Sequence, residues 1–440
     1  MSTDKLIADS TLLEQLAAVV GSEHVLRDDE SRTFYSTDVY RQADVLSEAV
    51  IQPADVDQLR DVVKLCSDAR CAMVVRGGGA SYTDGYLAVR SPTVCIDTGR
   101  LNKITVHEED MYVTAEVGVT WEALYNELAS RGLRTPFWGP FSGRVATVGG
   151  GMSSYAVNYG SGAYGLSAES LTGFDIVLAN GELLSTGSGG GVNSSAFFRF
   201  YGPDLTGIFA GDSGALGVKA RVSMRLIKNP EGFAACSFGF PDGESALKAQ
   251  MEVAALGVVA HSFGLDPRQQ KTALTRMEST STLEAARSIM RSARSPIDGL
   301  LQLAKMGMAG RNFLKNASYS AHFSCEGVTD EEARAKVAAV RAVAQKYGAE
   351  VANSIPLFFR AEPFMDLLPI LGPNGERWKP THSIVPFSKL LQHHADFEAL
   401  VDEYRERMDK RGVQLTRMLM AFSSNAFIYE PTFLWNDSQT

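Results

Sequence analysis

Apolar positions in the first half of the chain switch between helical and strand spacing. One helix is expected after Pro53, in the stretch ADVDQLRDVVKLCSDA, where apolar residues recur every three or four positions. These residues are Val56, Leu59, Val63 and Cys66. Short apolar or alternating runs predict strands at 71–76, 93–97, 111–117 and 216–227. The stretch 174–187 predicts a hairpin with Asn180-Gly181 at its turn, and Thr120 caps a helix that Gly132 ends.

The second half of the chain favours helices over a small antiparallel sheet. A strand is expected at 317–327, followed by a helix that begins with a capping box, Thr329 and Glu332. Another helix is expected over 393–411, and Gly412 directly behind it marks its end. The last apolar stretch, 417–435, predicts one or two strands.

Glycine is unevenly distributed, and this marks a domain boundary. Clusters lie at 76–85, 143–165, 187–191 and 211–217, and glycines thin out after residue 228. We therefore expect a first domain over 1–228 and a second over 229–440, with 228–232 as the linker. The mixture of elements predicts an α+β protein rather than a simple doubly wound sheet.

Composition narrows the classes of partner. The chain has 440 residues, a formal net charge of -9 and a pI of about 5.4, which argues against nucleic acid or an anionic membrane as its main partner. Five scattered cysteines without a C-x-x-C pair predict neither a disulfide framework nor a zinc site, and suit a cytoplasmic protein. The start does not resemble a signal peptide, and no run of about 18 apolar residues occurs. Peripheral attachment to a membrane stays open.

Three glycine-rich stretches carry the candidate chemistry. In RGGGASYTDG a strand leads into Gly77–Gly79, whose backbone N–H groups can bind one anion, with hydroxyls from Ser81 and Tyr82 nearby. A plain turn explains this segment about equally well, and its spacing fits neither a P-loop nor a Rossmann fingerprint. The stretch 146–165 adds three consecutive glycines followed by small and hydroxyl residues, which suits close approach to a flat ligand. GDSGALGV, at 211–218, is the third stretch.

The order of these motifs resembles a known family. RGGGASY, ATVGGGMSSYAVNYGSGAYG, FDIVLANGE and GPDLTGIFAGDSGALGV occur in the order typical of the PCMH-type FAD-binding domain, found in the vanillyl-alcohol oxidase, para-cresol methylhydroxylase and D-lactate/glycolate dehydrogenase superfamily. The resemblance covers roughly 20–228. It implies a two-subdomain PCMH-type FAD-binding domain followed by an α+β cap domain with an antiparallel sheet.

The resemblance also implies residues that contact FAD. The first loop binds the pyrophosphate through its backbone: Arg76, Gly77, Gly78, Gly79, Ala80, Ser81 and Tyr82. The second stretch runs along the pyrophosphate and the flavin: Ala146, Thr147, Val148, Gly149, Gly150 and Met152. The same wall continues through Asn158, Ser161, Tyr164 and Gly165. Val218 stands where the family often makes a backbone contact to the cofactor.

Several departures from the family pattern change the expected chemistry. Ala80 replaces a histidine that some members bond covalently to the flavin, and His382 stands four residues before Pro386, about one position away from another attachment site. We therefore expect noncovalent FAD, with covalent attachment through His382 as the alternative. Without that link, His382 is a general base or a hydrogen-bonded pocket or surface histidine. The segment AFSSNAFIYEP lacks the histidines of lactate-type members, so no metal is expected. The chain also lacks the family's usual C-terminal return segment, as a short or truncated member would.

Other catalytic candidates are few. Arg360 can bind a carboxylate or a developing alkoxide, although a surface salt bridge is the alternative. Tyr429, with Glu430, can orient a substrate hydroxyl or accept its proton, although Tyr429 also fits a half-buried strand position. His393 and His394, adjacent on a helix, make a poor chelate and are expected to face solvent.

These features together predict an FAD-dependent oxidoreductase that oxidises CH–OH groups by hydride transfer to flavin N5. The substrate is an alcohol or 2-hydroxy acid, or alternatively a phenolic compound of the vanillyl-alcohol or cresol type. A non-catalytic flavin-binding subunit is a further alternative. The expected electron acceptor is oxygen, a quinone or a redox protein, and a homodimer is possible.

Overall fold

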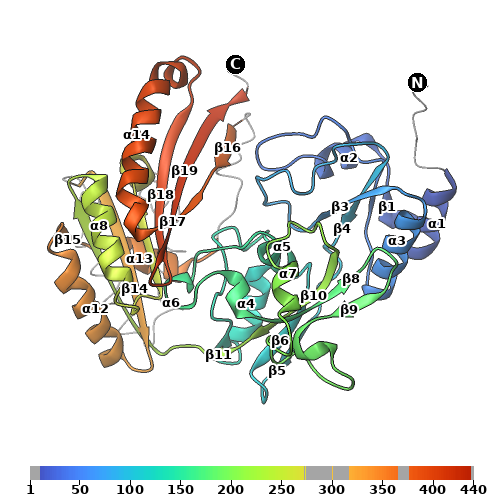
Figure 1. Ribbon diagram of the computed structural model, residues 1–440, viewed down its shortest axis with the longest axis horizontal. Helices are drawn as coiled ribbons and strands as arrows, with labels where there is room; N and C mark the ends of the chain where they lie inside the picture. Colours follow the sequence, from blue (N-terminus) through green and yellow to red (C-terminus); the bar gives the residue numbers. More distant parts are fainter. Residues whose placement is uncertain (1–9, 272, 274–299, 301–316, 365–375, 438–440) are drawn as a thin grey trace. The chain divides into compact units, whose positions relative to one another are not determined.

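The chain folds into two compact units. The computed structural model describes residues 10–271, 273, 300, 317–364 and 376–437 (Figure 1). Unit 1 comprises Met1–Val157 and Leu166–Asn229, and unit 2 comprises Asn158–Gly165 and Pro230–Thr440. The division falls beside the predicted boundary after residue 228, but the short stretch Asn158–Gly165 joins unit 2. Most of the chain start that was compared with a signal peptide, residues 1–9, lies outside the described residues.

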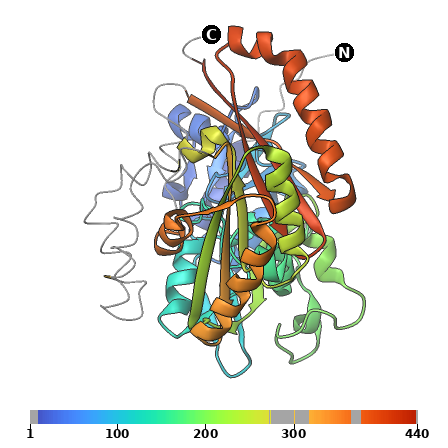
Figure 2. The same cartoon turned by 90° about the vertical axis from the view of Figure 1, so that its left-hand side faces the viewer.

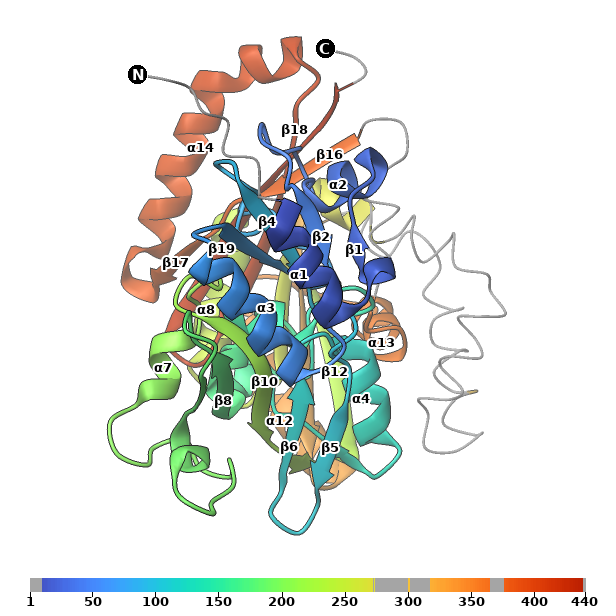
Figure 3. The same cartoon turned by 90° about the vertical axis from the view of Figure 1, so that its right-hand side faces the viewer.

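The first sheet of unit 1 is a small parallel sheet with one antiparallel edge strand. Its order is β1-β2-β4-β3, and β2, β4 and β3 run parallel. The strands are β1 (Val25–Leu26), β2 (Ala49–Ile51), β3 (Ala72–Arg76) and β4 (Thr93–Asp97). Helices α1 (Ser10–Val20) and α3 (Val56–Asp68) lie beside this sheet (Figure 3). The helix expected after Pro53 is α3, and the side chain of Asp55 caps it by accepting from Gln58 N.

The second sheet of unit 1 is antiparallel, with the order β5-β6-β10-β8-β9. Its strands are β5 (Ile104–His107), β6 (Tyr112–Glu116), β8 (Leu171–Val177), β9 (Leu183–Ser185) and β10 (Val218–Arg225). Gly181 takes a φ of 80° at the predicted turn between β8 and β9, where glycine is favoured. Helix α3 contacts strands of both sheets, so it forms the layer between them.

Shorter elements complete unit 1. They are α2 (Asp29–Tyr35), α4 (Trp121–Ala129), β7 (Leu133–Arg134), α5 (Val148–Ser153), α7 (Leu205–Phe209) and β11 (Ile227–Lys228). As predicted, Thr120 caps α4, with its hydroxyl accepting from Ala123 N at 3.2 Å.

Unit 2 is built on an eight-stranded antiparallel sheet. Its order is β15-β12-β14-β13-β18-β19-β16, and β17 also pairs with β19. The strands are β12 (Gly232–Phe240), β13 (His261–Leu265), β14 (Tyr319–Gly327), β15 (Ala349–Val351), β16 (Glu376–Pro380), β17 (Ser383–Pro386), β18 (Gln414–Phe422) and β19 (Ala426–Asn436). The predicted terminal strands are therefore a hairpin, with Ser423 at a φ of 52° in its turn. The α+β class and the antiparallel sheet of the second domain are confirmed.

Within the described residues, three helices cover one face of this sheet: α8 (Gly243–Ala254), α12 (Asp330–Ala344) and α14 (Phe387–Lys410) (Figure 2). We call this the helix face. Two apolar clusters join these helices to the strands, one around Phe238 and Phe323 and one around Leu390 and Phe427. On the opposite face, Phe359 of α13 (Ser354–Ala361) packs edge-on against Phe263. We call this the second face. Because strand side chains alternate, each strand residue belongs to one face.

Helix ends in unit 2 differ in detail from the prediction. Thr329 caps α12 as expected, but the Glu332 carboxylate accepts from Val328 N, one residue before the cap. Helix α14 begins at Phe387 rather than at residue 393, so His393 and His394 lie in its interior. All five cysteines are buried and free.

A buried histidine on the second face makes unit 2 sensitive to acid. His322 is fully buried, with its two ring nitrogens bonded to Ser237 Oγ at 2.8 Å and Ser320 Oγ at 3.0 Å. Burial, aided by the nearby His261, lowers the pKa of His322 to about 3. An unfolded histidine takes up a proton near pH 6.5, whereas the folded one does not until the pH approaches 3. Stability is therefore lost as the pH falls between these values.

We expect a His322→Gln variant to show a flatter pH dependence of stability than the wild type between pH 6.5 and 4.5. The difference in slope should approach about 1.4 kcal/mol per pH unit, the contribution of one proton. Urea unfolding at a series of pH values measures it. Parallel stability curves for the two proteins would show that His322 is protonated in the folded state.

Candidate functional site

The first glycine loop of unit 1 presents free backbone donors. It follows β3, and the N–H groups of Gly77, Gly78, Gly79 and Ala80 donate to no group in the described part of the chain. Gly79 has a φ of 69°, and its carbonyl accepts from the Tyr86 hydroxyl at 3.0 Å. Consecutive N–H groups in such a turn bind anionic oxygens well. The loop thus has the donors that a pyrophosphate needs.

The glycines at 77 and 78 are required by a second loop of the same unit. A Cβ on Gly78 would lie 1.6 Å from the carbonyl oxygen of Val145, and one on Gly77 would lie 2.3 Å from the Thr147 hydroxyl. The two predicted cofactor loops therefore touch each other directly. Gly79, rather than Gly78, has the positive φ among these glycines.

Arg76 lies beneath the first loop rather than on its surface. Its side chain is buried, and its guanidinium carbon lies 4.8, 4.7 and 5.5 Å from the ring centroids of Phe34, Tyr35 and Tyr86. Its Nε has no hydrogen-bond partner in the part of the chain that the structure describes. This placement gives Arg76 an electrostatic influence on the loop above it, because a desolvated cation is attractive to an anion nearby.

The glycines of α5 have different roles. A Cβ on Gly149 would lie 2.6 Å from Val117 Cβ, and one on Gly151 would lie 2.6 Å from Trp121 Nε1, so both glycines allow the helix to pack inside unit 1. Gly150 is exposed, and a Cβ there would have only the Thr147 hydroxyl nearby, at 3.4 Å. Packing within the protein therefore explains Gly149 and Gly151 but not Gly150. An open glycine beside the first loop fits a cofactor that approaches the backbone.

The other residues predicted to contact FAD in unit 1 make the following contacts within the protein. Ala146 O accepts from Trp121 N, the Thr147 hydroxyl accepts from Gly150 N, and Val148 and Met152 are fully buried. In the first loop, the Ser81 hydroxyl bonds the Thr83 hydroxyl at 2.9 Å, and Tyr82 is half-buried. Val218 is the first residue of β10, where it is buried opposite Val177.

The segment Asn158–Gly165 packs within unit 2, although it precedes the other residues of that unit in the chain. Asn158 Oδ1 bonds His261 Nε2 at 2.8 Å, while no described residue bonds the buried Asn158 Nδ2. The carbonyl of Ser161 accepts from Ser423 N at 3.0 Å. Short helix α6 (Ser161–Tyr164) ends at Gly165, which has a φ of 74°. The predicted cofactor residues Asn158 and Ser161 therefore also dock this segment on the sheet.

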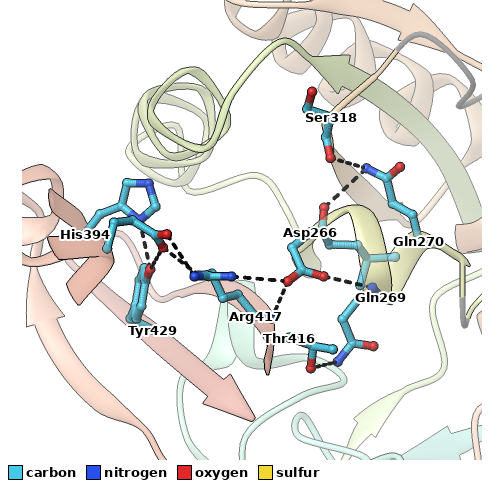
Figure 4. A network of polar contacts seen from close by, with 10 residues as sticks. Asp266, Gln269, Gln270, Ser318, His394, Thr416, Arg417 and Tyr429 are labelled. Atoms are coloured by element: carbon cyan, nitrogen blue, oxygen red, sulfur yellow. Dashed lines mark hydrogen bonds and ion pairs between the residues drawn. The ribbon is translucent and has the colours of Figure 1, made fainter. Parts of the chain in front are cut away.

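Adjacent residues of β19 face opposite sides of the sheet. Tyr429 packs on the helix face and is fully buried. Its hydroxyl lies 2.8 Å from His394 Nδ1 and 3.4 Å from Glu398 Oε1, as part of a polar network that includes Arg417 and Asp266 (Figure 4). The predicted contact of Tyr429 with substrate is therefore replaced by a structural role, since its hydroxyl is engaged within this network.

The histidines of α14 are also more buried than expected. The side chain of His394 is only 14% exposed, and burial lowers its pKa. His393 Nε2 lies 2.9 Å from Ser383 Oγ. The prediction that both histidines face solvent is wrong, because both lie in the interior of α14, where the packing of the helix on the sheet brings His394 to Tyr429 and His393 to Ser383.

On the second face, Glu430 and His382 lie side by side. His382 is placed between β16 and β17, and its Nδ1 lies 4.0 Å from Glu430 Oε2. Burial raises the pKa of Glu430 to about 7. Partial burial, followed by the nearby Lys379, lowers the pKa of His382. The arrangement can move a proton near neutral pH, because one group is a weak acid and the other stays neutral.

Arg360 has partners on the same face but farther along the sheet. Its Nη1 lies 3.0 Å from Glu326 Oε1, and its guanidinium carbon lies 4.2 Å from the ring centroid of Phe233. The predicted capture of a substrate carboxylate by Arg360 would have to compete with this ion pair. Among the residues that the structure describes, no group of three or more His, Cys, Asp or Glu could hold a metal ion. Nor does any described helix have the length and apolarity to cross a membrane.

Comparisons with known proteins agree with this geometry. The family described as FAD binding domain matches residues 47–187. The glycolate oxidase subunit GlcD of Bacillus subtilis is 28% identical over 218 residues, which are 50% of this chain and 45% of that protein. The flavoprotein subunit of 4-cresol dehydrogenase (hydroxylating) of Pseudomonas putida is 27% identical over 228 residues, 50% of this chain and 43% of that protein. The chain thus spans less than half the length of these curated relatives.

Two solved structures share the fold. That of p-cresol methylhydroxylase with substrate bound has a TM-score of 0.75 at 19% identity, and covers 98% of this chain and 83% of the other. That of alkyldihydroxyacetonephosphate synthase has a TM-score of 0.74 at 15% identity, and covers 99% and 79% respectively. Both likenesses concern the fold of the whole chain.

Proposed function

We propose, on the premise that the chain carries an FAD-binding domain of the PCMH type, that the protein is an FAD-dependent oxidoreductase acting on CH–OH groups. The observation that carries the proposal is the free backbone donors of the first glycine loop, inside the segment that matches the FAD-binding family. Relatives of two kinds, named for a hydroxy acid and for a cresol, make an alcohol or hydroxy acid the proposed substrate.

FAD would be held by unit 1 through its backbone. Gly78, Gly79 and Ala80 would donate to the pyrophosphate, and the open side of Gly150 would lie along the cofactor. Arg76 would add positive charge below the loop. Bound FAD supplies the acceptor for a hydride. The protein positions the substrate carbon and receives the hydroxyl proton, and His382 is the proposed base, because its lowered pKa keeps it neutral near pH 7.

The mode of attachment and the electron acceptor complete the proposal. Ala80 cannot form a covalent link to the flavin, so FAD would be bound noncovalently. Oxygen, a quinone or a redox protein would reoxidise it. The buried, unpaired cysteines are consistent with a reducing, cytoplasmic environment.

We expect the purified protein to be yellow and to release FAD, not FMN, on heating. The reason is that the first loop offers several donors to a pyrophosphate, which FMN lacks. Mass spectrometry of the released cofactor identifies it. A panel of alcohols and hydroxy acids, added without oxygen, should then include one that bleaches the flavin. Release of FMN alone would contradict the cofactor assignment, and a flavin that no member of the panel bleaches would favour a non-catalytic subunit.

A further inference from the structure

Glu430 has a buried carboxyl group on the second face, and its contacts within the fold do not account for a charged residue at this place. Its side chain is 12% exposed, and its residue is 9% exposed. The approach of the neutral His382, whose Nδ1 lies 4.0 Å from Glu430 Oε2, is the only polar side-chain contact of Glu430 among the described residues. Buried carboxyls with a purely structural role normally have several hydrogen bonds or a close cation.

The surroundings of Glu430 are mainly apolar. Met418 lies directly opposite on β18, and Ile428, two residues earlier on β19, lies opposite Ile384 on β17. Arg417, on the neighbouring strand β18, points to the helix face, where its guanidinium contacts Asp266 (Figure 4). It also pairs there with Glu398. On this face Glu430 therefore has the neutral His382 on one side, the apolar side chains of Met418 and Ile428 beside it, and the hydroxyl-bearing Thr432 two residues later on its own strand.

We propose that Glu430 relays the hydroxyl proton of the substrate to His382, the base of the proposed function, and that its charge excludes substrates bearing a carboxylate at this place. The inference rests on the proposed function and narrows it to neutral alcohols. A neutral hydroxyl can donate to an ionised carboxylate, whereas a second carboxylate in this weakly solvated site would be repelled.

The proton and electron balance is simple. The O–H bond of the alcohol breaks and its proton passes to a Glu430 carboxylate oxygen. The hydride of the adjacent C–H bond would leave with its electron pair for the acceptor that FAD supplies when it is bound, and a carbonyl group would form. The proton can then move to His382, which is 38% exposed and thus in contact with solvent. Nothing beyond FAD and its reoxidant is needed.

The acidity of Glu430 gives the proposal a pH signature. Because burial raises the pKa of Glu430 to about 7, the carboxyl is mostly neutral at pH 6 and mostly ionised at pH 8. Discrimination against a carboxylate should therefore increase as the pH rises through 7. The other titratable or charged groups near Glu430 are His382 and Lys379, together with Arg417 of the neighbouring strand, which lies on the opposite face.

The test compares binding of benzyl alcohol and mandelate, which differ by a carboxylate, to the oxidised FAD-loaded protein by isothermal titration calorimetry. We expect the wild type to prefer benzyl alcohol at least tenfold at pH 8 and clearly less at pH 6. In Glu430→Gln the preference should fall at least tenfold at pH 8 and lose its pH dependence. Glu350→Gln, the same change on the exposed edge strand β15, is the control and should keep the wild-type ratio.

A second variant should change the preference between benzyl alcohol and mandelate in the opposite direction. Met418→Lys places a cation directly opposite Glu430, and should shift the preference toward mandelate. The inference is overturned if Glu430→Gln keeps the wild-type ratio and pH dependence, if the wild type prefers mandelate, or if it binds neither probe. These outcomes concern binding alone. They are therefore distinct from failure of the proposed function, which would appear as a wild-type flavin that no alcohol bleaches.

Discussion

Replacing Gly78 by valine should yield protein with less than a tenth of the wild-type FAD content. The added Cβ would lie 1.6 Å from the Val145 carbonyl oxygen and 2.5 Å from its carbon. Because this neighbour is backbone, the two cofactor loops must separate to accommodate the side chain. FAD absorbance per mole of purified protein, and reconstitution with excess FAD, measure the effect.

Two further glycine variants separate loss of cofactor from loss of fold. Gly85→Ala is the control within the same loop region, since a Cβ there would have only ordinary contacts at 3.6 and 3.9 Å. Gly150→Val adds bulk at an exposed helical position where packing of the protein leaves room. It should leave the melting temperature of the cofactor-free protein nearly unchanged but weaken FAD binding. Full FAD occupancy in both Gly78→Val and Gly150→Val would refute our placement of the cofactor.

Replacing His382 by alanine should slow reduction of the flavin by a factor of about 100 while FAD stays bound. The variant removes a neutral base whose Nδ1 lies 4.0 Å from Glu430. Stopped-flow bleaching without oxygen, using the best alcohol of the panel, gives the rate. His107→Ala, a change in unit 1 on β5, is the control and should reduce its flavin at the wild-type rate.

The His382→Ala variant also shows whether His382 carries a covalently bound flavin. Acid precipitation of the wild type should leave a colourless pellet and a yellow supernatant, because Ala80 removes one covalent route and His382 pairs with Glu430. A yellow wild-type pellet that becomes colourless in His382→Ala would instead show that His382 carries the flavin. Unchanged reduction in His382→Ala would exclude it as the base.

Local signals in the sequence predicted several elements of unit 1 closely. The strand 93–97 coincides with β4, and the apolar spacing after Pro53 matches α3. Both β4 and α3 depend on residues that are close together in the chain, so the sequence alone predicts them. The start of α14 was placed six residues late. A signal was available, because Leu390, His394, Phe397 and Val401 share one helical face.

Other features depend on contacts between distant parts of the chain. Alternation along β19 implies that Tyr429 and Glu430 face opposite sides, but only the packing of α14 on the sheet decides which side is covered by helices. The partners of Asn158 and Ser161 are His261 and Ser423, which no local pattern connects to them. For the same reason, the pairing of Glu430 with His382 could not be predicted from either residue alone.

The docking of Asn158–Gly165 on the sheet of unit 2 bears on how the chain is made. During synthesis this segment leaves the ribosome before any strand of that sheet, while the unit 1 residues on either side of it can already pack. Its partners appear later: Ala260 accepts from Gly162 N, and Ser423, whose N–H donates to Ser161 O, follows in the turn after β18. Folding of the two units is thereby linked in time. A nascent chain completes the contacts of this segment only after β13 and the turn at Ser423 have both been made.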